Sequence, residues 1–225
     1  MDLQTISILR ISEDGLTKVE DVVAVEAPFS VMVNGRRAFS FTCTPSNLRE
    51  MVTGALYSRG YLVEAAQIAS MQITDGEIHV SLREGDEQVQ KKSVSKPDPD
   101  TERIFQTVKD LFSNPDTLFN RTGCAHSCAL MRNNEIICSF EDIGRHNALD
   151  KVIGYALNAG IPRADCVIFT SGRISGDYMS KIIHAGFLVA VSRAAVTCEA
   201  VRLARANGIT LYGFVRRNTA NRYSP

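Results

Sequence analysis

The sequence contains no tryptophan, carries no net charge and has no long uninterrupted apolar stretch. Its 25 basic and 25 acidic side chains cancel, so no overall basic field exists to attract a nucleic-acid backbone or an anionic membrane. No segment approaches the roughly 20 apolar residues of a membrane-spanning helix, and the first residues lack the basic-then-apolar order of a secretion signal. We therefore expect a cytoplasmic protein with neither nucleic acid nor membrane as a partner.

Cysteine is also scarce. Six cysteines in 225 residues are too dilute for the disulfide scaffold of a small secreted protein. There is no second Cys/His pair at the spacing of a zinc finger, and no internal repeat that would indicate a solenoid or a propeller. Four of the cysteines lie in apolar runs, and we expect them to pack in the core: Cys43, Cys138, Cys166 and Cys198.

What is present is a composition that can bury a core: 44% of the 225 residues are hydrophobic, which fits one or two domains. Residues 1–88 are predicted to form an N-terminal, strand-rich α+β domain. Short β-branched runs are separated by turn signals such as Asn34-Gly35, which predicts a hairpin, and one helix is expected between Ser46, as its N-cap, and Gly60. Residues 89–100 lack an apolar face and contain two prolines, so we expect a polar linker or mobile loop.

Residues 101–225 are predicted to form a C-terminal α/β domain. We expect a helix capped by Thr101, a hairpin centred on Asn133-Asn134, and a strongly amphipathic helix that begins at Asn147, with Asp150 as its capping partner. Strands and helices then alternate to the end of the sequence, which predicts a largely parallel sheet covered by helices. The whole chain is thus α/β, or α+β when the N-terminal domain is included.

Loops after the predicted strands are rich in glycine, hydroxyl groups and arginine. In an open α/β sheet, ligands bind at the carboxyl ends of the strands, where loops enter the next helix. Three such loops are the segment 171–176, Ser192-Arg193 and the segment 214–219. If the strands are neighbours, four arginines line one rim and suit a phosphate group; alternatively, these are ordinary turns with solvated arginines. The arginines are Arg173, Arg193, Arg216 and Arg217.

Arg145 and His146 precede the predicted amphipathic helix. A cation at that position is opposed by the positive end of the helix unless an anion lies between them, which indicates an anion-binding role. The alternatives are that Arg145 pairs with Glu141 or Asp142, and that His146 is a hydrogen-bonded structural histidine.

The segment Cys124 to Cys128 places two thiols and an imidazole within five residues. A neighbouring imidazolium, here that of His126, can lower the pKa of a thiol and so produce a nucleophilic thiolate. Zinc binding and a buried strand of small residues are the alternatives. If the segment were a strand, alternation would place Cys124, His126 and Cys128 on one face.

A resemblance to a known family rests on four stretches: EAPFSVMVNGRRAFSFTCTPSNLREMVTGALYSRGYL, TGCAHSCAL, EDIGRHNALDKVIGYAL, and SGRISGDYMSKIIHAG continuing to NGITLYGFVR. Over most of its length the chain resembles the formate dehydrogenase accessory sulfurtransferase family, FdhD. The resemblance implies a protein that accepts sulfur from a cysteine desulfurase as a persulfide. It then passes the sulfur to the molybdenum cofactor, as Mo-bis-molybdopterin guanine dinucleotide, before that cofactor enters formate dehydrogenase.

The resemblance also implies a C-terminal three-layer α/β domain like that of cytidine deaminases, and a homodimer. It places the cofactor-binding stretch on Phe214, Val215, Arg216, Arg217, Asn218 and Thr219. The arginine-rich rim then supplies charge-assisted contacts to the pyrophosphates of the cofactor. The further residues expected to bind the cofactor are Ser171, Gly172, Arg173, Ser175, Arg145, His146 and Arg193.

One motif that members of this family usually carry is missing. The family's persulfide forms on the first cysteine of a Cys-x-x-Cys motif between the two domains, and this chain contains no Cys-x-x-Cys. Two interpretations follow. Either Cys124, or failing that Cys128, bears the sulfur while His126 tunes its ionisation, or the protein is a non-catalytic chaperone that binds the cofactor without transferring sulfur. The zinc signature of the deaminases is absent as well, so the deaminase-like fold does not imply deamination. We expect no metal site, and a zinc protein that uses Cys124, His126 and Cys128 is the third interpretation.

Overall fold

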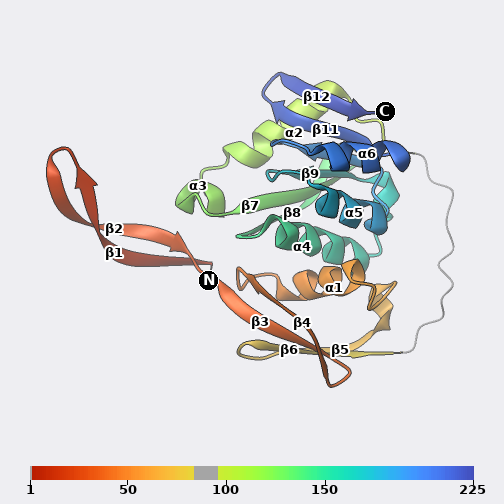
Figure 1. The fold of residues 1–225 in the computed structure, drawn as a ribbon, viewed down its shortest axis with the longest axis horizontal. Coiled ribbons are helices and arrows are strands. Elements are labelled where there is room, and N and C mark those ends of the chain that lie inside the picture. The colour runs from red at the N-terminus through yellow and green to blue at the C-terminus, as the bar shows by residue number, and fades with distance from the viewer. Residues whose placement is uncertain (1, 84–95) are drawn as a thin grey trace.

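The computed structural model describes residues 2–83 and 96–225 (Figure 1). Most of the linker expected at residues 89–100 falls outside the described residues, and residues 96–100 form no helix or strand. No helix within the two described ranges is long and apolar enough to cross a membrane.

A long two-stranded hairpin, which we call the arm, comes first in the chain. Strand β1 (Leu3–Ser12) pairs with β2 (Gly15–Ala24) along its whole length in antiparallel register. The arm forms a sheet of its own and projects from the body of the molecule on the side of α3 (Leu118–Thr122), against which β2 lies (Figure 1).

A four-stranded sheet in the order β4-β3-β6-β5 follows. The predicted hairpin at Asn34-Gly35 is confirmed: both residues have positive φ angles, 48° and 77°. The helix predicted between Ser46 and Gly60 begins at Leu48. Its N-cap is Asn47, in a left-handed conformation, and not Ser46 as predicted. The elements are β3 (Ala27–Val33), β4 (Arg36–Cys43), α1 (Leu48–Ser58), a short 3-10 turn (Ala65–Gln67), β5 (Ile68–Ile73) and β6 (Glu77–Leu82).

The C-terminal part is built around a six-stranded sheet in the order β12-β11-β10-β9-β7-β8. Its strands are β7 (His126–Arg132), β8 (Glu135–Asp142), β9 (Val167–Thr170), β10 (Val189–Ser192), β11 (Thr210–Arg216) and β12 (Thr219–Ser224). The helices are α2 (Thr101–Ser113), α3, α4 (Arg145–Asn158), α5 (Gly176–Ala185) and α6 (Cys198–Ala206), with a 3-10 turn at Arg163–Asp165.

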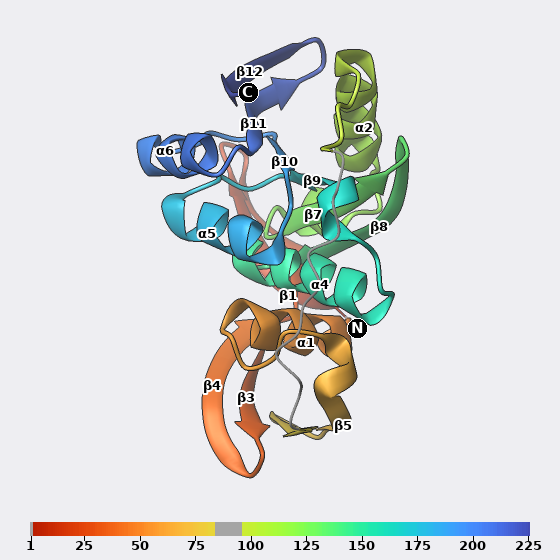
Figure 2. The ribbon, with the colours of Figure 1, turned by 90° about the vertical axis from the view of Figure 1, so that its right-hand side faces the viewer.

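Only β9, β10 and β11 are mutually parallel, so the expectation of a largely parallel sheet is corrected. Hairpins close both sides of the sheet: β7 runs antiparallel to β8 and to β9, and β12 antiparallel to β11. The predicted hairpin at Asn133-Asn134 is confirmed. Both asparagines adopt the left-handed conformation that a tight hairpin requires. Helices α4, α5 and α6 cover one face of the sheet and α2 covers the other (Figure 2).

Helices α1 and α4 cross so closely that their backbones touch. A Cβ atom added at Gly54 would lie 1.9 Å from the carbonyl oxygen of Asp150, and one added at Gly154 would lie 1.9 Å from that of Glu50. Around this crossing, one apolar core joins the four-stranded sheet, α1, α4 and the six-stranded sheet. The N-terminal and C-terminal parts are therefore packed through backbone contact.

A buried ion pair lies beside the crossing. Lys151 Nζ is 2.9 Å from Asp142 Oδ2, and neither side chain is exposed to solvent. Lys151 also donates hydrogen bonds to Thr44 Oγ1 (2.7 Å) and to the carbonyl oxygen of Glu141 (3.0 Å). The backbone N–H of Thr44, at the end of β4, donates to Asp142 Oδ2 (3.2 Å). The pair thus joins the last residue of β8 to the N-terminal part.

The predicted caps of α4 and α2, Asn147 and Thr101, are not the caps in the structure. Helix α4 begins at Arg145, so Asn147 lies inside its first turn, where its amide donates to Asp142 Oδ1 (2.8 Å) and to the carbonyl oxygen of Thr42 (2.8 Å). Asn147 therefore holds the loop before the helix rather than capping it. Helix α2 is capped by Asp100, one residue before the predicted Thr101.

We expect Gly154→Ala to lower the free energy of unfolding by about 3 kcal/mol, because the new methyl group must push two backbones apart. Chemical denaturation measures this, with Asn158→Ala at the exposed end of the same helix as the control. A Gly154→Ala protein as stable as the unaltered chain would contradict the described crossing.

Lys151→Met should cost about 3–5 kcal/mol, because it leaves the buried Asp142 carboxylate without a counter-charge. Adding Asp142→Asn to that variant should recover part of the loss. Lys151→Met, Asp142→Asn, the double variant and the unaltered chain form a double-mutant cycle, and urea denaturation measures the free energy of unfolding of each. If the double variant is no more stable than Lys151→Met alone, the pair does not interact as described.

Candidate functional site

The candidate site lies along one edge of the six-stranded sheet. Strands β9, β10 and β11 end there, and the antiparallel β7 begins there, since His126 is paired with Asp142 and Cys128 with Thr170. Helices α4, α5 and α6 all start at this edge. The edge therefore combines three helix N-termini, each carrying a partial positive charge, with the predicted arginine-bearing loops.

Hydrogen bonds hold the predicted glycine-serine loop rigidly in place. Ser171 Oγ accepts from the backbone N–H of Ser127 (2.9 Å), and the N–H of Ser171 donates to the carbonyl oxygen of Ser127 (2.9 Å). The N–H of Gly172 donates to Thr170 Oγ1 (3.1 Å), while Ser192 Oγ donates to the carbonyl oxygen of Gly172 (2.8 Å). These hydrogen bonds join the loop after β9 to the start of β7 and to the end of β10.

Arg145 packs against this loop. A Cβ atom added at Gly172 would lie 2.9 Å from Arg145 Cβ and 3.5 Å from His126 Nδ1, so only glycine leaves room for these two side chains. Arg145 Nη2 donates to Ser175 Oγ (3.4 Å). Its Nε is buried and has no hydrogen-bond partner among the described residues, so its N–H can donate to an anion that reaches it. The predicted alternative of a pair with Glu141 or Asp142 is not formed.

The same surroundings determine the state of His126. Burial, first, and then the positive charges of Arg145 and Arg173 lower its pKa from the usual 6.5. His126 is therefore mainly neutral at neutral pH, and it cannot supply the imidazolium charge expected from the sequence. The two arginines supply the positive field instead.

His146 is engaged in a different way. Its Nε2 lies 3.2 Å from Asp177 Oδ2, and its ring packs edge-on against Tyr178. Burial and the nearby Lys181 lower the pKa of His146, while a hydrogen bond from Ser175 is the main cause of the lowered pKa of Asp177. This arrangement matches the structural interpretation of His146, with Asp177 as its partner.

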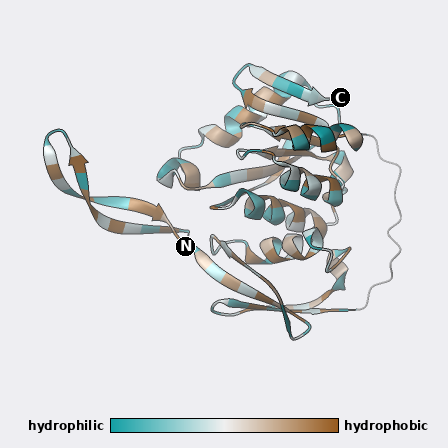
Figure 3. Ribbon diagram, viewed as in Figure 1, coloured by the Kyte–Doolittle hydropathy of each residue, from teal (hydrophilic) through white to brown (hydrophobic). Residues whose placement is uncertain are grey.

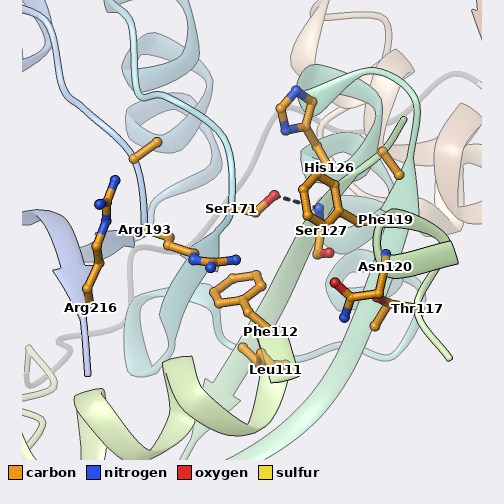
Figure 4. A pocket seen from close by; sticks show the side chains of 12 residues that line it. Leu111, Phe112, Thr117, Phe119, Asn120, His126, Ser127, Ser171, Arg193 and Arg216 are labelled. Atoms are coloured by element: carbon orange, nitrogen blue, oxygen red, sulfur yellow. Dashed lines mark hydrogen bonds between the residues drawn. The ribbon is translucent and has the colours of Figure 1, made fainter. Parts of the chain in front are cut away.

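A first cavity of about 410 Å³ opens at this edge between α2, α3 and the start of β7 (Figure 4). One wall is apolar, formed by Leu111, Phe112 and Phe119. Arg193, beside Phe112, and Arg216 line the cavity as well. The remaining lining residues are Thr117, Asn120, Ala125, His126, Ser127, Ser171 and Ala194.

A second, larger cavity of about 990 Å³ adjoins the first, and the two share Phe112, Arg193 and Arg216. The guanidinium carbon of Arg193 lies 5.4 Å from the centroid of the Phe112 ring, so this arginine stacks on the aromatic wall. Arg217, Asn218 and Thr219 line the second cavity as well.

The remaining predicted cofactor-binding residues occupy different positions. Val215 is fully buried in the core, so only its backbone can face a ligand. Phe214 is partly exposed and has a positive φ of 51°, and its N–H donates to the carbonyl oxygen of Ala194 (2.9 Å). Arg173 is exposed and lies near His126.

The structure separates the two candidate thiols. Cys124 is exposed in the loop between α3 and β7, and its N–H donates to Thr122 Oγ1 (3.1 Å). Cys128 is buried inside β7, where burial strongly raises its pKa and the Tyr178 hydroxyl donates to its sulfur (3.8 Å). Because the strand begins at His126, Cys124 does not share the alternating face that the other two residues occupy.

Three of the four cysteines predicted to pack in the core do so at least in part. Burial raises the pKa of Cys43 and of Cys138 to about 12, and that of Cys166 to about 11. Cys198, at the start of α6, is exposed, which corrects the prediction. It lies at the first turn of the helix, outside the buried stripe that includes Ala200 and Ala204.

Glu141 fixes the position of α3, a role that the sequence did not predict. Its carboxylate accepts hydrogen bonds from the N–H groups of Leu118 (2.6 Å) and Phe119 (3.3 Å), and from Ser127 Oγ (3.1 Å). Glu141 thereby fixes the short helix that precedes Cys124. No local signal reveals this role, because the partners are more than ten residues away in the sequence.

Comparison with known proteins gives a consistent result. A family model described as the FdhD/NarQ family matches residues 24–97 and 84–225. The sulfur carrier protein FdhD of Staphylococcus haemolyticus is 32% identical, in an alignment covering 99% of this chain and 95% of the relative. The protein of the same name from Sulfolobus acidocaldarius is 32% identical, with 100% and 97% coverage.

A solved structure from Desulfotalea psychrophila, described as a formate dehydrogenase accessory protein, superimposes with a TM-score of 0.85. It shares 27% sequence identity, and the match covers 99% of this chain and 97% of that one. Together with the family match over both parts of the chain, this confirms the resemblance seen in the sequence motifs. The chain belongs to the FdhD/NarQ family.

Proposed function

We propose that this protein is a sulfur carrier that takes sulfur from a cysteine desulfurase and passes it to Mo-bis-molybdopterin guanine dinucleotide for formate dehydrogenase. The names of the relatives support the role of sulfur carrier, and the description of the similar structure supports the link to formate dehydrogenase. The desulfurase as donor and the molybdenum cofactor as acceptor rest on the family resemblance. The observation that carries it is the position of the exposed Cys124 next to Ala125, His126 and Ser127, which line the first cavity.

In the loading step, the Cys124 thiolate attacks the outer sulfur of a persulfide on the desulfurase. A new S–S bond forms at Cys124, the S–S bond of the desulfurase breaks, and the desulfurase thiolate leaves. The thiol proton of Cys124 passes to solvent. In the delivery step, a nucleophilic group of the acceptor forms a bond to the outer sulfur and supplies the electron pair for it. The S–S bond to Cys124 breaks, and the Cys124 thiolate leaves. Cys128 is a poor candidate for this chemistry, because burial disfavours its thiolate.

The positively charged edge of the sheet suits two anions, the persulfide on Cys124 and the phosphates of the cofactor. Arg145 and Arg173 exert a positive field at His126, two residues from Cys124, and this field favours a persulfide anion there. The phosphates of the cofactor fit Arg193 and Arg216, which line the first cavity and can provide charge-assisted hydrogen bonds. Arg145, beside Gly172, has an unpartnered Nε that is a further donor. The aromatic wall at Phe112 offers a stacking surface for a base.

A second candidate function is that of a chaperone that binds the cofactor without carrying sulfur. The arginine-rich edge favours it, because none of its contacts depends on a thiol and the chain lacks Cys-x-x-Cys. This function predicts cofactor binding that is unchanged when both Cys124 and Cys128 are replaced.

The proposal includes three further features implied by the family resemblance: a homodimer, a cytoplasmic location and a C-terminal domain like that of cytidine deaminases. The strand order β8-β7-β9-β10-β11, with helices on both faces, is compatible with such a three-layer domain. Deamination itself is not part of the proposal.

Incubation of the reduced protein with a cysteine desulfurase and cysteine should add one sulfur atom, removable by reductant, to the peptide that contains Cys124. Peptide mass spectrometry checks this. Cys124→Ala should abolish the adduct, whereas Cys198→Ala, which removes the other exposed thiol, should keep it.

Loss of the adduct only in a Cys128→Ala variant would assign the sulfur to Cys128. No adduct on any cysteine, with a Cys-x-x-Cys relative loaded in parallel as the positive control, would reject the sulfur carrier and leave the chaperone.

Arg216→Ala should weaken the binding of guanosine diphosphate, used as a probe for the nucleotide end of the cofactor, by about tenfold, the value of one charge-assisted hydrogen bond. Titration calorimetry measures this. Arg36→Ala removes the same charge from the remote four-stranded sheet and should leave the affinity unchanged. Equal affinities for the two variants would show that the arginine-rich edge does not hold the nucleotide.

A further inference from the structure

The tip of the arm carries an exposed apolar cluster that the site does not use. Leu9, Ile11 and Leu16 have 65%, 80% and 68% of their surface exposed within the described chain. Leu9 and Ile11 alternate onto the same face of β1, and Ile11 is paired with Leu16 across the hairpin. Hydrophobic residues run along both strands of the arm (Figure 3).

An isolated arm of this kind is not expected to be stable on its own. A two-stranded ribbon has only one partner for each strand and is marginal in water unless something covers one of its faces. Contiguous exposed aliphatic side chains on a projecting element indicate a contact surface. The base of the arm is supported where β2 lies against α3, but the tip extends away from the body (Figure 1).

We propose that the tip of the arm docks in the first cavity of a second copy of this chain and forms part of the wall of that site. The partner copy thus contributes Leu9, Ile11 and Leu16 to the site of its neighbour. This goes beyond the homodimer proposed above, because it assigns the contact and gives the arm a place in the site.

The two surfaces have complementary chemistry. The cavity presents an apolar wall of Leu111, Phe112 and Phe119, and Phe119 is itself 44% exposed. The tip presents aliphatic side chains of matching character. Beside them, the turn between the two strands carries the exposed carboxylates of Glu13 and Asp14, while the rim of the cavity carries Arg193 and Arg216. Apolar surface therefore meets apolar surface, and negative charge meets positive charge. The arginines are those that the proposed function assigns to the cofactor phosphates, so the docked tip and the phosphates share them.

The position of the arm favours a reciprocal exchange. The arm leaves the body on the side of α3, and α3 itself lines the cavity through Phe119 and Asn120 (Figure 1). Ten residues in each strand reach about 33 Å. Two copies that face each other across a two-fold axis can then each place an arm against the other, which closes the assembly as a dimer.

Sedimentation velocity on the full chain tests the contact. The unaltered protein should be a dimer, and a Leu9→Asp/Ile11→Asp variant should shift at least tenfold toward monomer in its dissociation constant. Thr17→Asp adds one such charge near the tip on the opposite face of the arm and should remain dimeric. A monomeric unaltered protein, or a Leu9→Asp/Ile11→Asp variant that remains as dimeric as the control, would overturn the proposal.

A disulfide trap identifies the occupied surface. In a background with Cys124→Ser and Cys198→Ser, chains carrying Ile11→Cys are mixed with chains carrying Phe119→Cys and oxidised. The expected product joins one chain of each kind, whereas Arg36→Cys in place of Phe119→Cys should give none. A product that joins two Ile11→Cys chains instead would place the tips against each other and reject cavity docking. Both readouts are independent of sulfur transfer, so they succeed or fail separately from the proposed function.

Discussion

Backbone contact between α1 and α4 determines how the two parts of the chain are arranged. Gly54 and Gly154 leave so little space that each helix lies against a carbonyl group of the other. This approach brings Thr44 to the buried pair of Asp142 and Lys151. Because Asp142 is the last residue of β8, and also accepts from the N–H of Gly144, the same interactions fix the start of α4. The position of Arg145 in the site thus depends on a contact made on the opposite side of its helix.

The edge of the six-stranded sheet owes its chemistry to topology. Placing β7 antiparallel to β9 brings its first residues, with His126 and Ser127, to the edge where β9, β10 and β11 end. Arginines from four separate loops or elements then converge on one region, although the chain as a whole is electrically neutral. Burial, and then the positive charge of Arg145 and Arg173, lowers the pKa of His126, so the arginines and not the imidazole supply the positive charge of the site.

Local signals in the sequence predicted the features that depend on local geometry. Asn34-Gly35 and Asn133-Asn134 were identifiable as hairpins because few other residues tolerate positive φ. The loops after β9, β10 and β11 were identifiable because each strand has a clear apolar run. Non-local interactions account for the features that the sequence did not predict. Helix α3 is held by Glu141 of strand β8, and Asn147 donates to Asp142 instead of capping α4. Edge strand β5 has only Met71 buried, so its pattern is too weak to detect.

In the proposed function, the exposed thiol of Cys124 and the arginine-rich cavity form one site. The most direct test is the rate at which Cys124 and Cys198 are alkylated, followed by peptide mass spectrometry with and without saturating guanosine diphosphate. Both thiols are exposed, but only Cys124 lies beside the cavity. The account predicts that the nucleotide slows alkylation of Cys124 and leaves Cys198 unchanged. Equal rates at Cys124 with and without bound nucleotide would contradict it.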